Sequence, residues 1–336
     1  MIGIEPNPYA RLLPVKNGIL RPLWSVMIPT HNCAAYLRET LASVLAQDPG
    51  ANIMQIEVVD DCSTRDNPAE VVEELGRGRV EFYRQSNNQG YISNFETCLQ
   101  RSRGYLIHLL HGDDYVRAGF YSNLQRAFDA KPEIGAAFCR CLYIDEQGDW
   151  QGLSPLEQST SGLVTDWLEK IAAGQRLAPP SVVVRREVYE RLGGFNRRLS
   201  CAGEDWEMWV RIATRYPFWF EVEPLAAYRM KRAGSLTAGS SASGKLARDM
   251  RKATEIVESY LPDYLPRSSA RRASRQARMM YSRWALESLF QMPVTANPRA
   301  FFTQIGEVLR CSHSSKTILL LISSLLRKAA TRGGRV

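Results

Sequence analysis

Apolar and polar residues follow two alternating patterns between residues 24 and 215. Short apolar runs, of which WSVMI at residues 24–28 is the first, have the length and composition of buried strands. Between these runs, apolar residues recur every three or four positions, as expected for helices with one buried face. The pattern predicts strands at 24–28, 56–59, 80–83, 105–110, 136–144 and 182–184, and helices at 37–45, 68–75, 92–101, 118–128 and 203–215.

Strands that alternate with helices of this length predict an α/β fold. Its central sheet is expected to be mostly parallel and Rossmann-like, with helices on both faces. Asn32, just before the first helix, is predicted to cap it. Ligands of such sheets bind beyond the carboxyl ends of the strands, so the functional residues are expected in the loops that follow the strands.

The chain is expected to comprise three regions. Residues 1–22 contain four prolines and little periodicity, which indicates an irregular lead-in. Residues 23–240 hold the alternating elements, and residues 245–336 have a helical pattern. The whole chain has a net charge of +8, but the last region alone has 17 basic against 6 acidic residues. The two larger regions are therefore expected to have different tasks.

Adjacent carboxylates follow two of the predicted strands. Asp60 and Asp61 come directly after the strand at 56–59, and Asp113 and Asp114 follow the strand at 105–110. Since both pairs fall at carboxyl ends of strands, we expect them at one edge of the sheet. Two adjacent like charges repel each other unless a positive group lies beside them. The Asp113–Asp114 pair therefore raises the question of which cation balances it.

Six sequence segments together resemble family 2 glycosyltransferases, which have the GT-A fold. They occur in the order and spacing of that family, and the resemblance covers roughly residues 24–237. The segments are VMIPTHN, VVDDCS, NQGYISN, GYLIHLLHGDD, VVVRREVYERLGGF and GEDWEMWVRIA. The resemblance implies an inverting hexosyltransferase that moves a sugar from a nucleotide-diphosphate-sugar to a hydroxyl of a glycan or lipid-linked acceptor, in cell-surface polysaccharide biosynthesis.

The resemblance implies a divalent metal as the missing cation. A metal held by carboxylates and water neutralises the charge that grows on the diphosphate as the sugar leaves. Asp113 and Asp114 match the family's acidic motif, in which one member faces the metal and diphosphate and the other the ribose. Oxygen ligands favour Mg²⁺ or Mn²⁺. Many relatives carry a further Asp where this chain has His111, which implies weaker binding or a different ligand set.

The nucleotide is expected to contact three loops. Asp61 resembles the family position that accepts a hydrogen bond from the base. Around it, the resemblance assigns to the nucleotide pocket Pro29, Thr30, Asn32, Asn88 and Gly90. For Asp60 and Asp61 the alternative is a cap and turn after the strand, and for Asn88 and Gly90 it is simple turn chemistry.

Asp205 matches the family's catalytic base. In an inverting transfer, one carboxylate removes the acceptor proton as the hydroxyl attacks. Glu204 and Trp206 are assigned to the acceptor side, and burial by Trp206 and Trp209 is expected to raise the pKa of Asp205. The alternative is that Glu204 and Asp205 only complement the helix N-terminus.

Arg229 and Lys231 are assigned to the diphosphate, because the family often places a histidine at the position of Lys231. A protonated lysine cannot bind a metal, but it can contact phosphate oxygens. The alternative is a solvated basic loop.

The basic tail permits three interpretations. Its arginines and the apolar run 318–326 could bind an anionic membrane surface. It could form a helical bundle with charged outer faces. Nucleic-acid binding is the third, but no recognised motif and little aromatic interleaving support it, so no nucleic acid is expected.

The predicted location is the cytoplasm, with a peripheral position at the inner face of the cell membrane. Seven scattered cysteines without a CxxC pair predict neither a zinc site nor a disulfide framework. No secretory signal and no apolar run of roughly 20 residues is recognised.

Two other functions stay open, a non-catalytic carbohydrate-binding or scaffold protein on a degenerate GT-A fold and a sugar nucleotidyltransferase. The donor base, the sugar and the acceptor are not distinguished.

Overall fold

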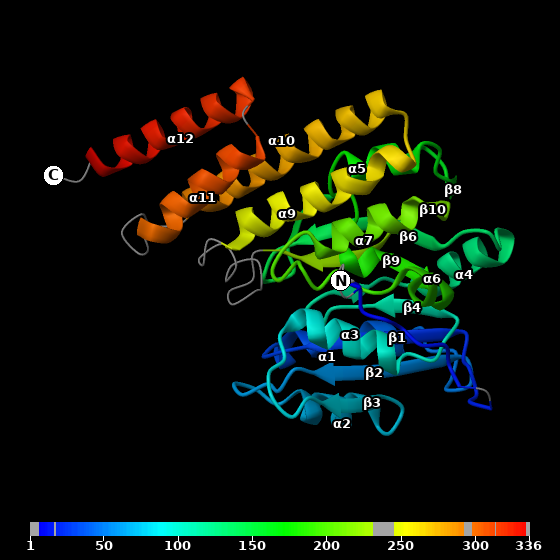
Figure 1. Cartoon of the computed structure of the whole chain (residues 1–336). Coiled ribbons are helices and arrows are strands. Elements are labelled where there is room, and N and C mark those ends of the chain that lie inside the picture. Colours follow the sequence, from blue (N-terminus) through cyan, green and yellow to red (C-terminus); the bar gives the residue numbers. More distant parts are fainter. Residues whose placement is uncertain (1–6, 17, 231–244, 292–297, 313, 334–336) are drawn as a thin grey trace, which may run out of the picture. The chain divides into compact units, whose positions relative to one another are not determined.

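The computed structural model describes residues 7–16, 18–230, 245–291, 298–312 and 314–333. They belong to two compact units (Figure 1). Unit 1 comprises Met1–Trp167, Arg176–Arg198 and Arg215–Met230, and unit 2 comprises Leu168–Gln175, Leu199–Thr214 and Lys231–Val336. No helix in the described part of the chain combines the length and the hydropathy needed to cross a bilayer.

Unit 1 is built on a ten-stranded mixed sheet in the order β3-β2-β1-β4-β9-β6-β10-β5, with β7 paired to β6 and β8 to β10. Strands β3, β2, β1 and β4 are mutually parallel, β9 is antiparallel to both β4 and β6, and β6 and β10 are parallel to each other. The strands are β1 (Trp24–Thr30), β2 (Met54–Asp60), β3 (Glu81–Arg84), β4 (Leu106–Leu109), β5 (Tyr115–Val116), β6 (Ala136–Ile144), β7 (Trp150–Leu153), β8 (Gly162–Leu163), β9 (Val182–Arg185) and β10 (Phe218–Arg229).

Helices cover both faces of this sheet (Figure 1). One face packs on α1 (Ala34–Leu45), α2 (Pro68–Gly76) and α4 (Phe120–Ala130), in a core that includes Val26, Leu41 and Phe120. Side chains alternate along a strand, so Glu57 of β2 points to the opposite face, where it bonds to Arg101 of α3 (Tyr91–Arg101). Helix α6 (Arg186–Leu192) adjoins α3, because Arg186 donates to the carbonyls of Leu99 and Ser102. The predicted α/β fold with a mostly parallel central sheet is confirmed.

The sequence pattern missed the longest strand and misplaced one helix cap. Strand β10 begins with three consecutive aromatic residues, but Glu221 and Pro224 interrupt its apolar pattern where its pairing with β6 shifts register. Asn32 does not cap α1, so that prediction is wrong: the N-cap position is Cys33. The free N–H of Ala34 is instead satisfied by the Asp66 carboxylate at 2.8 Å, from a loop 32 residues away.

The lead-in is irregular but packed. Its backbone at Ala10 exchanges hydrogen bonds with Gly194 and Phe195, and Tyr9 forms a bridge with Asn196. A side chain on Gly193 would meet Tyr9 at 2.7 Å, at a φ of +80°. Because Gly193 and Gly194 have no side chain, the lead-in can pass close to the backbone at these two residues.

Unit 2 is helical. Helix α7 (Glu204–Ala213) packs on α9 (Lys245–Tyr260), and a side chain on Gly203 would meet Ala253 at 2.7 Å. The buried Asp249 accepts the main-chain N–H groups of Ser200 and Cys201, which fixes the loop before α7. The other long helices are α10 (Arg267–Gln291), α11 (Pro298–Cys311) and α12 (Ser315–Gly333). Unit 2 thus combines the predicted 245–336 region with Leu168–Gln175 and Leu199–Thr214.

Candidate active site

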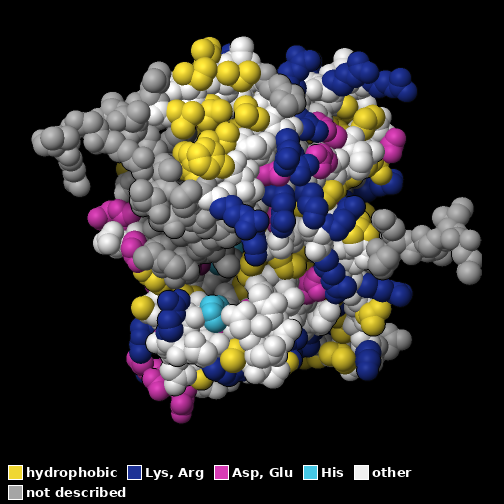
Figure 2. Space-filling model, turned by 60° about the vertical axis from the view of Figure 1, so that its left-hand side comes forward, with side chains coloured by type: hydrophobic (Ala, Val, Ile, Leu, Met, Phe, Trp, Pro, Cys, Tyr) yellow, Lys and Arg dark blue, Asp and Glu magenta, His cyan; other side chains and the backbone are white. Residues whose placement is uncertain are grey.

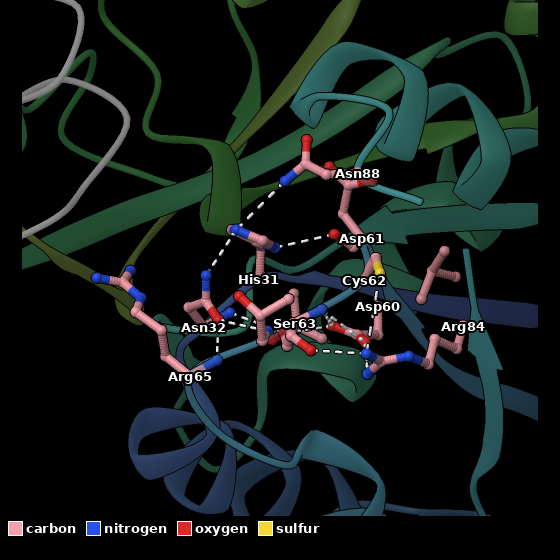
Figure 3. Close-up of polar contacts among 12 residues, drawn as sticks. His31, Asn32, Asp60, Asp61, Cys62, Ser63, Arg65, Arg84 and Asn88 are labelled. Carbon is pink, nitrogen blue, oxygen red and sulfur yellow. Dashed lines mark hydrogen bonds and ion pairs between the residues drawn. The ribbon is translucent and has the colours of Figure 1, made fainter. Parts of the chain in front are cut away.

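The loops after β1 and β2 are joined by hydrogen bonds (Figure 3). Strand β1 pairs with β2 so that Thr30 lies opposite Asp60, which brings the two carboxyl ends together. The Asn32 carboxamide oxygen accepts the N–H groups of Thr64 and Arg65 at 3.0 Å each, and φ at Asn32 is 50°. Asn32 thus serves to hold the second loop rather than to begin α1.

Asp60 is a structural carboxylate. Its side chain is fully buried, accepts the N–H and the hydroxyl of Ser63, and pairs with Arg84 of β3 at 2.7 Å. These contacts tie the turn at 60–63 to the neighbouring strand. For Asp60 the structure therefore agrees with the turn interpretation.

Asp61 organises a third loop. One oxygen accepts the N–H of Gln89 at 2.7 Å and the other accepts the N–H of Gly90 at 3.0 Å. Gly90 has a φ of 82° and stands at the N-cap position of α3. Each carboxylate oxygen has a second lone pair, so these bonds leave Asp61 able to accept a further N–H.

His31 lies at the meeting point of the three loops, and the sequence reasoning did not single it out. Its Nδ1 lies 2.9 Å from the Asp61 carbonyl, and its Nε2 faces the side-chain amides of Asn32 at 2.7 Å and Asn88 at 3.3 Å (Figure 3). The carbonyl requires a donor and the two NH₂ groups require an acceptor. These partners suit a ring in which Nδ1 donates and Nε2 accepts.

A tight turn after β4 gathers three candidate metal ligands. The N–H of Asp114 donates to the carbonyl of His111 at 3.1 Å, and Gly112 donates to the carbonyl of Pro29 at 3.0 Å. A side chain on Gly112 would meet Thr30 Oγ1 at 3.1 Å, so the turn lies directly against the end of β1. One ligand atom each of His111, Asp113 and Asp114 lies within 4.8 Å of the others.

An imidazole and two carboxylates at this spacing fit a divalent cation. Asp114 is buried, whereas His111 and Asp113 are partly exposed, so one side of the cluster is open to a ligand. Burial lowers the pKa of His111, opposed by the Asp113 carboxylate, which raises it.

Arg229, at the end of β10, fixes this turn. Its main-chain N–H donates to Asp114 Oδ1 at 2.8 Å, and its Nε donates to the Asp113 carbonyl at 3.1 Å. Its other guanidinium contacts are the carbonyls of Asp145 and Glu146, at 3.0 Å each, and the Glu39 carboxylate at 2.5 Å. Because the guanidinium is buried in these contacts, a diphosphate could reach it only by displacing them. Lys231 lies outside the described residues.

Asp205 lies in the first turn of α7 in unit 2. Its Oδ1 accepts the N–H of Trp206 at 2.7 Å, and its Oδ2 accepts the Gln175 amide at 2.6 Å. Burial raises the pKa of Asp205 to about 6, although both hydrogen bonds lower it. Trp206 is 1% exposed, donates to the Ile171 carbonyl and packs edge-on against Tyr281. Its indole belongs to the core of unit 2, while Glu204 is partly exposed.

The structure brings the nucleotide and metal candidates of unit 1 to one edge of the sheet. These are Pro29, Thr30, Asn32, Asp61, Asn88, Gly90, Asp113 and Asp114. Residues Glu204, Asp205 and Trp206 belong to unit 2.

Comparison with known families decides the identity of this arrangement. The family model of glycosyl transferase family 2 matches residues 25–193, which is half of the chain. The chain belongs to glycosyltransferase family 2. The matched region contains the whole edge formed by His31, Asp61 and the turn at 111–114.

Sequence relatives of this family 2 chain include polysaccharide synthases. A protein of Mycobacterium tuberculosis, MT1568, is 28% identical over 236 residues, which is 65% of this chain and 70% of the relative. Chondroitin synthase of Pasteurella multocida is 33% identical over 117 residues, which is 33% of this chain and 12% of the synthase. The chain therefore matches only a small part of that synthase.

Solved structures show the same GT-A fold. S. aureus TarS 1–349 in complex with UDP-GlcNAc has a TM-score of 0.57 and 17% identity, covering 86% of this chain and 88% of that one. The mannosyltransferase PcManGT from Pyrobaculum calidifontis, in complex with GDP-Man and Mn²⁺, has a TM-score of 0.55 and 19% identity. The match covers 96% of this chain and 90% of the mannosyltransferase. At this identity the similarity establishes the fold.

Proposed function

We propose that this family 2 glycosyltransferase moves a hexose from a nucleotide-diphosphate-sugar to a hydroxyl of a glycan or lipid-linked acceptor, with inversion, in cell-surface polysaccharide biosynthesis. The observation that carries the proposal is the edge of unit 1, where Asp61 and His31 lie on the loops that adjoin the His111–Asp114 turn. Complexes of similar folds with UDP-GlcNAc and GDP-Man support a nucleotide-sugar donor. The polysaccharide synthase among the relatives supports a saccharide acceptor.

In this proposal, the three loops of Figure 3 bind the nucleoside. Asp61 offers a buried, oriented acceptor to an N–H edge of the base, and its bonds to Gln89 and Gly90 keep it in place. His31 is proposed to lie beside the base, held by its contact with the Asn32 amide, and Thr30 and Asn32 complete the ribose side.

Asp113 and Asp114 are proposed to hold the metal, Mg²⁺ or Mn²⁺, and through it the diphosphate. When bound, the metal neutralises the charge that develops on the leaving nucleotide. Arg229 is proposed to keep both residues in register through its bonds to Asp113 and Asp114, in place of a direct contact with phosphate. For Lys231 the diphosphate assignment stays a proposal.

Asp205 is proposed as the general base that removes the proton of the acceptor hydroxyl. Its pKa of about 6 leaves it ionised at neutral pH, yet basic enough to accept that proton as the hydroxyl attacks. Glu204 is proposed to contact the acceptor. Trp206 is instead proposed to support Asp205 from the core, because its indole is buried.

A screen of nucleotide-sugars tests the donor assignment. We expect one base class, presented as a diphosphate-sugar with Mn²⁺, to raise the Tm of the full chain by mass action, and the same donor to be slowly hydrolysed. Sugar 1-phosphates with nucleoside triphosphates serve as the comparison set. Turnover of that set would instead indicate a nucleotidyltransferase, and donor binding without any hydrolysis or transfer would indicate a non-catalytic protein.

The tail is proposed to bind an anionic membrane surface through α11 and α12, which would place the enzyme at the inner face of the cell membrane. Helix α12 exposes four aliphatic side chains on one face, and Phe302 of α11 is 67% exposed between Arg299 and Arg310. The four are Ile318, Leu319, Ile322 and Leu325. Figure 2, viewed from this side, shows apolar side chains gathered at the top of the face, with basic ones nearby.

Flotation with vesicles tests this surface. We expect the full chain to float with vesicles that contain anionic phospholipid, and the double substitution Phe302→Ser with Leu319→Ser to reduce the floated fraction severalfold, because both side chains contribute apolar area to the interface. The control is Leu20→Ser, which removes an equally exposed leucine, 70% accessible, from the lead-in. Equal flotation of the double variant and the control variant would contradict the proposal, as would no flotation of the unmodified chain.

A further inference from the structure

We infer that His111 is the third protein ligand of the metal, which makes the site select Mn²⁺ and other transition metals over Mg²⁺. This inference rests on the proposed function, because it concerns the metal of the same reaction.

The backbone of the turn brings the imidazole to the carboxylates. The bond from the Asp114 N–H to the His111 carbonyl closes a four-residue turn, which brings the first and last residues close together. His111 Nδ1 is 3.9 Å from Asp114 Oδ2, and the ligand atoms of all three residues are within 4.8 Å of each other. Two ligands that are each about 2.1 Å from one cation lie at most about 4.2 Å apart, and the 3.9 Å between His111 Nδ1 and Asp114 Oδ2 is within that limit.

Neighbouring residues fix the orientation of two of the three ligands. The His111 ring stacks on Phe95 of α3, with centroids 4.9 Å apart and planes at 20°. The other oxygen of Asp114, Oδ1, accepts the N–H of Arg229. Aromatic stacking thus sets the imidazole plane, and a main-chain bond sets the carboxylate, in the way that supporting contacts position metal ligands elsewhere.

The kind of ligand determines which metal is preferred. Imidazole is a good ligand for first-row transition metals, whereas Mg²⁺ requires oxygen ligands and retains much of its water. A site with two carboxylates and one imidazole accordingly favours Mn²⁺ over Mg²⁺. With aspartate at position 111 the ligand set would consist of oxygen alone, and the preference should move towards Mg²⁺.

Pulsed EPR of the full chain loaded with Mn²⁺ tests the ligand directly. We expect the electron spin echo of bound Mn²⁺ to be modulated by a ¹⁴N nucleus of imidazole, with Mn²⁺ alone and with UDP or GDP present. His111→Asp should abolish this modulation while Mn²⁺ stays bound. His31→Gln is the matched control, because it removes the other imidazole at this edge and should leave the modulation intact.

Metal titration provides a second measurement. We expect Mn²⁺ to bind about tenfold or more tightly than Mg²⁺, and His111→Asp to reduce that ratio by about tenfold. The inference would be overturned by persistent ¹⁴N modulation in His111→Asp or by an unchanged Mn²⁺/Mg²⁺ ratio, even if the enzyme hydrolyses its donor. If the unmodified chain binds no divalent metal and hydrolyses no donor, the proposed function itself fails.

Discussion

Replacement of Asp205 by asparagine is expected to lower the rate of sugar transfer by about 10²- to 10⁴-fold, because the acceptor proton then has no base to receive it. Donor binding should be unchanged, since Asp205 has no part in the nucleotide loops of unit 1. The measurement is kcat with the best donor and acceptor, together with the Kd of the donor. Asp263→Asn, an exposed carboxylate in the short helix at Leu261–Asp263, controls for the loss of charge in the same unit.

The pH dependence of the same residue gives an independent check. Transfer by the unmodified enzyme should decline as the pH falls through about 6, where Asp205 becomes protonated. Folding raises the pKa of this carboxyl from 3.8 to about 6, so stability falls as the pH rises through this interval and stays lower at neutral pH, where the buried group is charged. Asp205→Asn should therefore keep or raise the Tm at neutral pH. A large fall in Tm would mean that Asp205 mainly stabilises α7, and retained transfer would remove the assignment as base.

Removal of divalent cations is expected to abolish transfer. EDTA should stop the reaction and added Mn²⁺ should restore it, because the proposed metal neutralises the charge that develops on the leaving diphosphate. Asp114→Asn should raise the Mn²⁺ concentration for half-maximal activity by about 10- to 100-fold. Asparagine retains the Oδ1 atom that accepts the Arg229 N–H, so the turn should survive.

Asp129→Asn, an exposed carboxylate of α4, is the matched control for this substitution. It should leave both the Mn²⁺ requirement and the rate as they are. Full activity in EDTA, or an Asp114→Asn variant with an unaltered Mn²⁺ requirement, would show that the reaction proceeds without a metal at this turn.

The sequence was sufficient to predict that the acidic loops of unit 1 lie at one edge of the sheet. Parallel strands carry their ligands at one edge, so the order of strands and helices alone assigned the loops with Asp61 and with Asp113 and Asp114 to the same edge. Strand β10 could not be predicted, because Glu221 and Pro224 interrupt its apolar pattern. The strand nevertheless continues, because its pairing with β6 shifts register at these residues.

The roles of individual polar residues were harder to predict, because they depend on partners distant in the chain. Arg229 looked like a phosphate ligand, but its guanidinium reaches Glu39, 190 residues earlier, and the carbonyl of Asp113, 116 residues earlier. Nothing in the sequence around His31 pointed to its place in the site, because its contacts are with Asp61 and Asn88 on other loops. Asn32 was predicted to cap α1 because it stands just before the helix. The N–H of Ala34 instead donates to the carboxylate of Asp66.

Arg229 is also the penultimate residue of unit 1, since unit 2 resumes at Lys231. The same residue that ends β10 donates its main-chain N–H to the carboxylate of Asp114. A shift of the backbone at the end of β10 would therefore displace Asp113 and Asp114 together, because Arg229 holds the first through its guanidinium and the second through its main-chain N–H.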